Sequence, residues 1–94
     1  MRVTVLLPGV LRANADDQAT LDVEVAEPAT LGDLLDVLAE RYPALERRLR
    51  DERSTLRRYV NFYVDGEECR FSGGTGTVLR DAAEVQIIPS VAGG

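Results

Sequence analysis

The sequence predicts an α+β protein in which a mixed sheet of about five strands carries one main helix packed on one face. Two observations lead to this prediction. Several short segments alternate apolar and polar residues with a period of two, and a single longer segment places leucines at helical spacing. Strand and helix patterns do not alternate along the chain, so an all-parallel α/β sheet is not expected. No linker divides the 94 residues, which therefore form one predicted domain.

A hairpin is expected near the N-terminal end. Residues 2–7 alternate apolar and polar side chains and stop at Pro8-Gly9, and residues 20–26 alternate again. The connection over residues 10–19 contains turn-forming Asn and Asp and is predicted to be a loop. The two strands should therefore pair antiparallel.

The main helix is predicted to begin at Thr30. The Thr30 hydroxyl can cap the first turn, and Asp33 stands three residues later as the partner of a capping box. Pro43 ends this helix after about twelve residues, and residues 45–49 continue a helical spacing for a turn or two. The apolar stripe expected to pack on the sheet consists of Leu31, Leu34, Leu35 and Leu38.

The second half of the chain supplies the remaining strands. Residues 59–64 alternate, the Asp65-Gly66 pair is a hairpin signal, and residues 67–71 are expected to pair back as a short edge strand. Residues 72–76 are expected to be a flexible loop, and residues 84–89 form the last strand. The first and last strands are expected to lie side by side and parallel in the centre of the sheet.

The charge of the chain is unevenly distributed. All eleven basic residues are arginine, against sixteen acidic residues, and the net charge of −5 is unfavourable for binding a phosphate backbone. Residues 41–58 differ, with seven arginines against three acidic side chains. This segment is interpreted either as a solvated helix and loop or as a docking patch for an acidic partner. An RNA-binding role would require salt-sensitive binding despite the acidic total.

Composition also limits the chemistry available to the chain. With no His and a single Cys, neither a metal site nor a His-based catalytic arrangement is expected, and no bound cofactor is predicted. Cys69 is expected to be an inert, half-buried thiol. The N-terminal residues do not resemble a signal peptide, and no apolar run reaches the roughly 18 residues of a membrane span, which predicts a cytoplasmic protein.

The candidate reactive group is the carboxylate of Gly94. Gly93 and Gly94 have no side chains, so they place this carboxylate on an unbranched arm that can enter a narrow channel. We therefore expect a domain over residues 1–88, followed by a flexible C-terminal Gly-Gly tail over residues 89–94.

A partner that acts on this tail also needs a surface to grip. The predicted strand alternation places Leu6, Tyr63 and Ile88 on the open face of the sheet, close to the point where the tail leaves it. These three residues are predicted to form an exposed apolar patch that binds a partner.

Three stretches resemble the ubiquitin-like sulfur-carrier proteins of the β-grasp fold, the ThiS/MoaD family, which includes the thiamin-pathway carrier and the small subunit of molybdopterin synthase. These stretches are Thr30-Leu31-Gly32-Asp33-Leu34-Leu35, Val60-Asn61 and Val85-Gln86-Ile87-Ile88-Pro89-Ser90-Val91-Ala92-Gly93-Gly94. Residues 58–64 and 70–74, together with the preceding arginine-rich segment, are similar to the actinobacterial cysteine-synthesis branch. Residues 81–84 and Ser90 depart from the usual family pattern, although neither departure touches the terminal glycines.

The resemblance implies a carrier that is a co-substrate of partner enzymes and not an enzyme itself. A partner adenylyltransferase of the E1-like type would use ATP to convert the Gly94 carboxylate to an acyl-adenylate, and a sulfur nucleophile would then give a thiocarboxylate. In the cysteine branch, this sulfur would attack an aminoacrylate held on pyridoxal phosphate by a partner synthase, and a metallopeptidase would release the product. Val91, Ala92 and Gly93 would line up in the adenylation channel.

Two alternatives stay open from the sequence. The chain is also compatible with the small subunit of molybdopterin synthase, or with a sulfur carrier for another cofactor or natural product. A different class is a ubiquitin-like conjugation or interaction module, in which Gly94 would be joined to a lysine of a target protein. Neither the sulfur source nor the acceptor follows from the residues.

Overall fold

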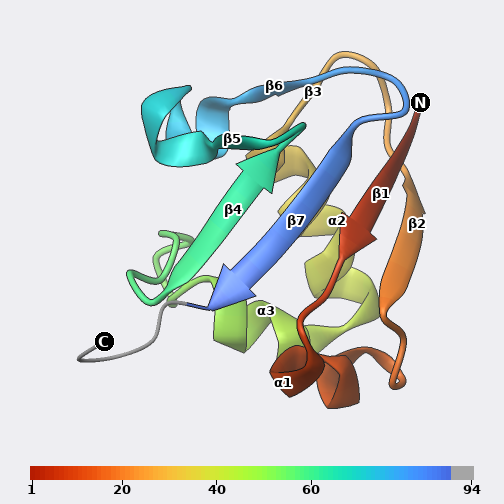
Figure 1. Cartoon of the computed structure of the whole chain (residues 1–94), viewed down its shortest axis with the longest axis vertical. Coiled ribbons are helices and arrows are strands. Elements are labelled where there is room, and N and C mark those ends of the chain that lie inside the picture. The colour runs from red at the N-terminus through yellow and green to blue at the C-terminus, as the bar shows by residue number, and fades with distance from the viewer. Residues whose placement is uncertain (90–94) are drawn as a thin grey trace.

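The computed structural model describes residues 1–89. Its main sheet has five strands in the spatial order β2-β1-β7-β4-β5 (Figure 1). β1 and β7 are parallel neighbours in the middle of the sheet, and the other pairs are antiparallel. The predicted hairpin and the predicted parallel pairing of the first and last strands are therefore confirmed. The strands are β1 (Arg2–Leu6), β2 (Thr20–Glu24), β4 (Val60–Val64), β5 (Glu67–Glu68) and β7 (Glu84–Pro89).

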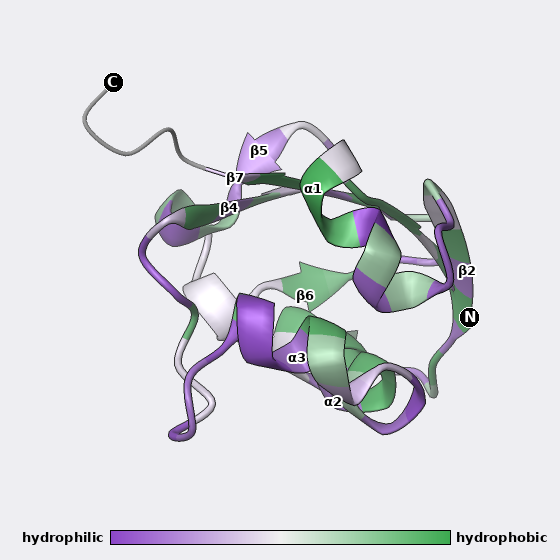
Figure 2. Cartoon of the chain, turned by 90° about the horizontal axis from the view of Figure 1, so that it is seen from below, coloured by the Kyte–Doolittle hydropathy of each residue, from purple (hydrophilic) through white to green (hydrophobic). Residues whose placement is uncertain are grey.

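Two helices, α2 (Leu31–Arg41) and α3 (Pro43–Leu49), cover one face of the sheet (Figure 2). The predicted capping box begins α2: the Thr30 hydroxyl accepts a hydrogen bond from the Asp33 amide at 3.3 Å, and the Asp33 carboxylate accepts one from the Thr30 amide at 2.9 Å. Together with the sheet, the predicted leucine stripe forms the core, because Leu31, Leu34, Leu35 and Leu38 are all buried. Within residues 1–89, no helix combines the length and apolar character needed to cross a bilayer.

The prediction of a loop over residues 10–19 is wrong for residues 10–15, which are helical, whereas residues 16–19 do connect to β2 without a helix or strand. A short helix, α1 (Gly9–Arg12), is followed by a 3-10 helix, η1 (Ala13–Ala15). The reason is packing, since Leu11 and Ala15 are both buried in the core and a helical turn brings residues four apart onto one side.

The chain after β5 is also more regular than predicted. Cys69–Phe71 forms a 3-10 helix, η2, so the edge strand expected over residues 67–71 has only two residues. The chain turns at this point because the thiol of Cys69 is buried in the core. The expected loop contains another 3-10 helix, η3 (Gly74–Gly76), and β6 (Val78–Leu79) then pairs with β3 (Ala29–Thr30) in a separate two-stranded sheet that the sequence did not reveal.

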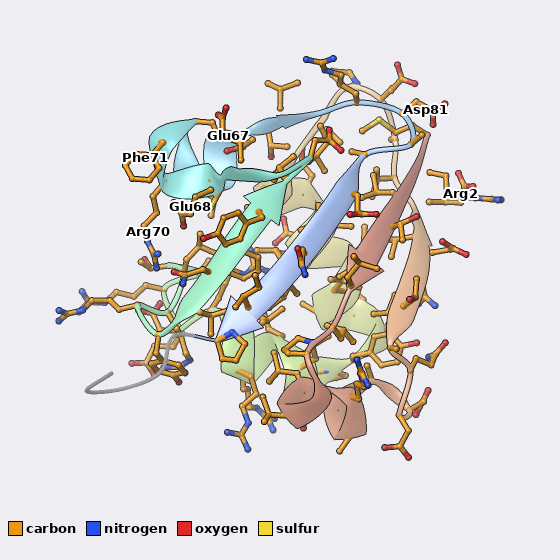
Figure 3. The ribbon with its side chains drawn as sticks, viewed as in Figure 1. Arg2, Glu67, Glu68, Arg70, Phe71 and Asp81 are labelled. Carbon is orange, nitrogen blue, oxygen red and sulfur yellow. The ribbon has the colours of Figure 1, made fainter. Side chains whose placement is uncertain are left out.

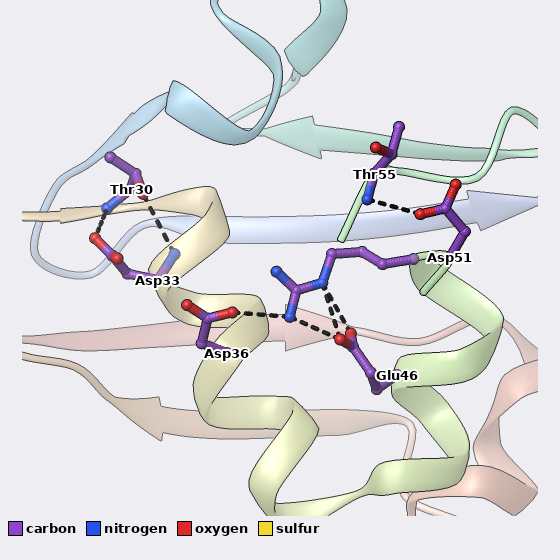
Figure 4. Close-up of polar contacts among 7 residues, drawn as sticks. Thr30, Asp33, Asp36, Glu46, Asp51 and Thr55 are labelled. Atoms are coloured by element: carbon purple, nitrogen blue, oxygen red, sulfur yellow. Dashed lines mark hydrogen bonds and ion pairs between the residues drawn. The ribbon is translucent and has the colours of Figure 1, made fainter. Parts of the chain in front are cut away.

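One arginine of the basic segment belongs to the interior. Arg50 is only 5% exposed, and its Nη2 lies 2.9 Å from Asp36 Oδ1 on α2 and 2.8 Å from Glu46 Oε2 on α3 (Figure 4). Burial disfavours the charged guanidinium, but hydrogen bonds and charges from both carboxylates outweigh it and raise the pKa of Arg50. Arg50 therefore ties the two helices together and is not part of the basic surface.

Candidate functional site

The open face of the sheet is defined by the alternation along β7. Ile87 points toward the helices and is 1% exposed, so Gln86 and Ile88 face the opposite side. Leu6 and Tyr63 are the strand partners of Gln86 on either side. The predicted members Leu6, Tyr63 and Ile88 therefore share one face, but Gln86 separates two of them and the apolar patch is interrupted.

A shallow depression of about 350 Å³ lies beside Ile88, where β1 and β7 end. Leu6, Pro8 and Arg12 contribute to its walls, so apolar surface and a cation occur together here. The Arg12 Nε donates a hydrogen bond to the Leu7 carbonyl at 3.1 Å, which holds the side chain against the end of β1. Arg12 was missed by sequence reasoning because the turn that carries it was taken for a loop. The four-residue spacing of the buried apolar residues around it was the available signal.

The other side of the β7 end is formed by the beginning of β4. Val60 is the strand partner of Pro89, so the residues that precede Val60 lie next to the last described residue of β7. Two of these residues, Arg58 and Tyr59, are exposed, and Tyr59 is 50% exposed. An aromatic ring and a cation are thus presented beside the point where the predicted tail begins.

Arg70 holds this segment in place from η2. Its Nη2 donates to the carbonyls of Arg58 and Val60 at 3.3 and 3.2 Å, and its Nη1 donates to Asn61 Oδ1 at 2.5 Å. In Figure 3, the Arg70 side chain reaches from η2 toward the beginning of β4. A single guanidinium therefore fixes the backbone that flanks the β7 end. Sequence reasoning did not find this role, since the contacts span nine to twelve residues of chain.

The neighbouring thiol is not a reactive centre in this arrangement. Cys69 is 1% exposed, and burial raises its thiol pKa, with the charge of Glu68 acting in the same direction. The charge of Arg70 opposes this shift but does not outweigh it. Cys69 is more deeply buried than the half-buried thiol that the sequence suggested.

The predicted reactive and channel residues lie outside the described residues. They are Val91, Ala92, Gly93 and Gly94, which follow Ser90 in the sequence. The structure does describe the strand from which they continue: Pro89 is the last residue of β7, the central strand between β1 and β4.

A five-stranded mixed sheet with parallel central strands and a helical layer on one face is the β-grasp architecture of ubiquitin-like proteins. Solved structures agree with this class. A chain of the Amycolatopsis orientalis BexX/CysO complex superposes with a TM-score of 0.86 at 34% sequence identity, over 98% of this chain and 99% of that chain.

The chain belongs to the ThiS family of ubiquitin-like sulfur carriers, whose family pattern matches residues 5–94. It is 41% identical to the sulfur carrier protein CysO of Mycobacterium tuberculosis over 96 residues, covering 100% of both chains. It is also 36% identical over 94 residues to the molybdopterin synthase sulfur carrier subunit of the same organism, covering 100% of this chain and 99% of the relative. Proteins of this family are small carriers rather than enzymes.

Proposed function

We propose that this chain carries sulfur for cysteine biosynthesis as a thiocarboxylate on Gly94. The main support for the proposal is the position of β7. This central strand ends at Pro89, and Gly94 is the fifth residue after it in the sequence. The full-length similarity to a CysO sulfur carrier supports the cysteine branch. Since activation needs ATP, we place this role in the cytoplasm.

The chemistry divides between the carrier and its partners. An ionised carboxylate is a poor acyl donor, so a Gly94 oxygen first attacks the α-phosphorus of ATP on an adenylyltransferase and pyrophosphate leaves. A sulfur nucleophile then displaces AMP, and the C–S bond replaces the C–O bond of the adenylate. On a partner synthase, pyridoxal phosphate would supply an electrophilic serine-derived acceptor, and the thiocarboxylate sulfur would add to its β-carbon to give a thioester of Gly94. The Gly94 acyl group would then move from this sulfur to the amino nitrogen of the new cysteine, so that the C–N bond replaces the C–S bond and the thiol is freed. A metallopeptidase would finally hydrolyse the peptide bond between Gly94 and the new cysteine.

The contribution of this chain is presentation of its end. Gly93 and Gly94 have no Cβ, so they leave clearance in a narrow adenylation channel, while Val91 and Ala92 supply side chains that contact its walls. The exposed Ile88, with Leu6 and Tyr63 on the same face, gives partners an apolar grip close to the tail. No side chain of the carrier has to act as acid, base or metal ligand in this scheme.

Intact-mass measurement tests the proposal directly. The chain is incubated with ATP, sulfide and an adenylyltransferase from the same organism, and its mass is expected to rise by the difference between one sulfur and one oxygen atom. The increase must disappear when Gly94 is deleted. An unchanged mass, together with isopeptide-linked products on target lysines, would favour the conjugation module instead.

The 36% identity to a molybdopterin synthase carrier subunit supports a second candidate within the same chemistry. To separate the two, the thiocarboxylate form is offered either O-phosphoserine or O-acetylserine with a pyridoxal-phosphate synthase, or a molybdopterin precursor with a large synthase subunit. Consumption in the first reaction alone supports the cysteine role. Consumption in the second alone would overturn it.

A further inference from the structure

The short tail makes the surface around Pro89 part of any complex in which Gly94 is activated. Gly94 is the fifth residue after Pro89 in the sequence, and five fully extended residues span at most about 17 Å. An enzyme that encloses the Gly94 carboxylate must therefore bring the rim of its channel against the end of β7. The inference below rests on the proposed function, because it concerns the partner that activates Gly94.

Arginines lie on both sides of the β7 end. Arg12 shares the depression beside Ile88 on the β1 side. Arg57 and Arg58 lie on the β4 side, just before the strand partner of Pro89. None of the three forms an ion pair with any acidic residue among residues 1–89. We call Arg12, Arg57 and Arg58 the basic collar.

The collar is held in a defined place. The Arg57 Nε donates to the Arg47 carbonyl at 2.7 Å, and the Arg57 amide donates to the Leu49 carbonyl at 3.0 Å, so this residue is anchored to α3. The Arg58 carbonyl is held by Arg70, and its side chain makes no hydrogen bond within the described part of the chain. Among residues 1–89, the Arg58 guanidinium therefore has no hydrogen-bond or ion-pair partner, and its backbone position is fixed.

The opposite end of β7 carries the other sign of charge. Asp65, Asp81 and Glu84 are exposed around its first residues, and the Asp65 carboxylate accepts a hydrogen bond from the Glu84 amide at 2.9 Å. In Figure 3, Asp81 lies at this end, away from Arg70. With a net charge of −5, the chain is an acidic domain; the basic collar lies at the β7 end, whereas the exposed arginines at the other end, Arg2 and Arg80, lie among these acidic residues. Such a distribution orients a protein in the field of a charged partner.

We propose that the basic collar docks on a carboxylate-lined rim around the tail channel of the activating adenylyltransferase. Opposite charges at the rim accelerate encounter and orient the carrier with its tail toward the channel. The acidic end of β7 disfavours the reversed approach to the same rim. The apolar residues of the open face then contribute to the bound complex, whereas the collar sets the orientation of encounter.

Carrier-dependent pyrophosphate release by the adenylyltransferase measures this role. The test variant combines Arg12→Glu with Arg58→Glu. The matched control combines Arg2→Glu with Arg80→Glu, two exposed arginines at the other end of the sheet: Arg2 is the first residue of β1, and Arg80 precedes β7. The net charge changes equally in both variants. Thermal unfolding checks that each variant is folded.

The collar variant is expected to lose about tenfold or more in kcat/KM, with kcat changed by less than about twofold, because rim charges act on association. The control variant should stay within about threefold of the unmodified chain, and the difference should shrink as ionic strength rises from about 0.02 M to about 0.3 M. Equal rates for the two variants, or a loss confined to kcat, would overturn the proposal.

Two further outcomes have distinct meanings. If the unmodified chain supports neither pyrophosphate release nor a mass change, the proposed function fails. The collar is then judged by calorimetric binding to the same enzyme without ATP, where equal affinities for the test and control variants would overturn it. Fluorescence anisotropy with a single-stranded RNA probe tests the competing ligand, and collar-dependent RNA binding at physiological salt would assign the collar to nucleic acid instead.

Discussion

On the sheet face covered by α2 and α3, Phe62, Val85 and Ile87 are at most 1% exposed, whereas on the opposite face of the same strands Ile88 is 38% exposed. The two isoleucines are adjacent in β7, and only the pleat of the strand separates their environments. The covered face holds the interlocking core. The open face carries polar residues between a few apolar ones. Its residues can be substituted with little effect on the packing of the core.

This difference separates stability from recognition within a single strand. Substitutions on the covered face create cavities and lower the free energy of unfolding. Substitutions on the open face remove contact surface that only a partner uses. The same strand therefore supports the fold with one set of residues and presents the predicted binding patch with the other.

The largest expected effect comes from the matched pair of isoleucines. Ile87→Ala should lower the free energy of unfolding by about 2–5 kcal/mol, because a buried side chain leaves a cavity. Ile88→Ala should lower it by less than about 1 kcal/mol, since the side chain is partly solvated already. Urea denaturation of both variants measures the difference. Equal losses of unfolding free energy in the two variants would contradict the proposed difference between the two faces.

The functional counterpart of that pair is Ile88→Asp. A charge on the open face should strongly reduce activation by the adenylyltransferase while the chain stays folded, because it disrupts apolar contact with the partner. Rates of carrier-dependent pyrophosphate release and thermal unfolding are measured side by side. Full activity of the folded variant would show that Ile88 is not part of the binding surface.

An intermediate effect is expected in the helical layer, where Arg50 connects α2 to α3. Arg50→Ala should cost about 1–3 kcal/mol of unfolding free energy, because Glu46 and Asp36 lose a charge-assisted partner. Arg50→Met also leaves both carboxylates without this partner, but it keeps much of the side-chain volume and should cost less than Arg50→Ala because it leaves a smaller cavity. If the Met variant loses as much as the Ala variant, the polar contacts rather than the packing set the cost.

A smaller, local effect is expected at Arg70 beside the open face. Arg70→Ala should increase amide hydrogen exchange at Val60, because the carbonyls of Arg58 and Val60 lose their common donor. Arg70→Lys keeps the charge but not the forked donor geometry, so it should restore the protection only in part. Mass spectrometry of exchange over residues 57–61 provides the measurement. Unchanged exchange in the Ala variant would show that the segment is held by other contacts.

The smallest effect is a pH dependence from the loop at the end of α3. Amide hydrogen bonds lower the pKa of Asp51 below its ordinary value of 3.8: the larger effect comes from Thr55 (Figure 4), and the next from Arg53. The folded-state pKa is depressed, so the stabilising contribution is present above the ordinary pKa and is lost as pH falls through the folded value. Asp51→Asn should therefore weaken the loss of stability below about pH 4. Urea midpoints from pH 2 to 7, compared with the unmodified chain, should reveal a slightly flatter profile, and an identical profile would contradict the assignment.

The sequence by itself determined the features whose patterns are local. The alternation over residues 84–89 predicted β7 with correct bounds, and the Thr30 and Asp33 pair predicted a capping box that is present. It also predicted that Ile88 faces away from the helices, because the side-chain period of a strand is two. The family, too, was indicated by local stretches of residues.

Only the tertiary structure decided the features that depend on distant contacts. The short helix α1 forms because Leu11 and Ala15 reach the core, and their single four-residue spacing is too short a pattern to distinguish a helix from a loop in the sequence alone. Two-residue strands such as β3 and β6 have no alternation to detect. Folding brings together two contacts at the end of the sheet where β7 ends. Arg70 donates hydrogen bonds to the beginning of β4, and Arg12 lies beside Ile88, although these residues are separated in sequence. Side-chain chemistry alone does not specify which backbone carbonyls or strand ends will be neighbours, because the packing of the whole chain sets those distances.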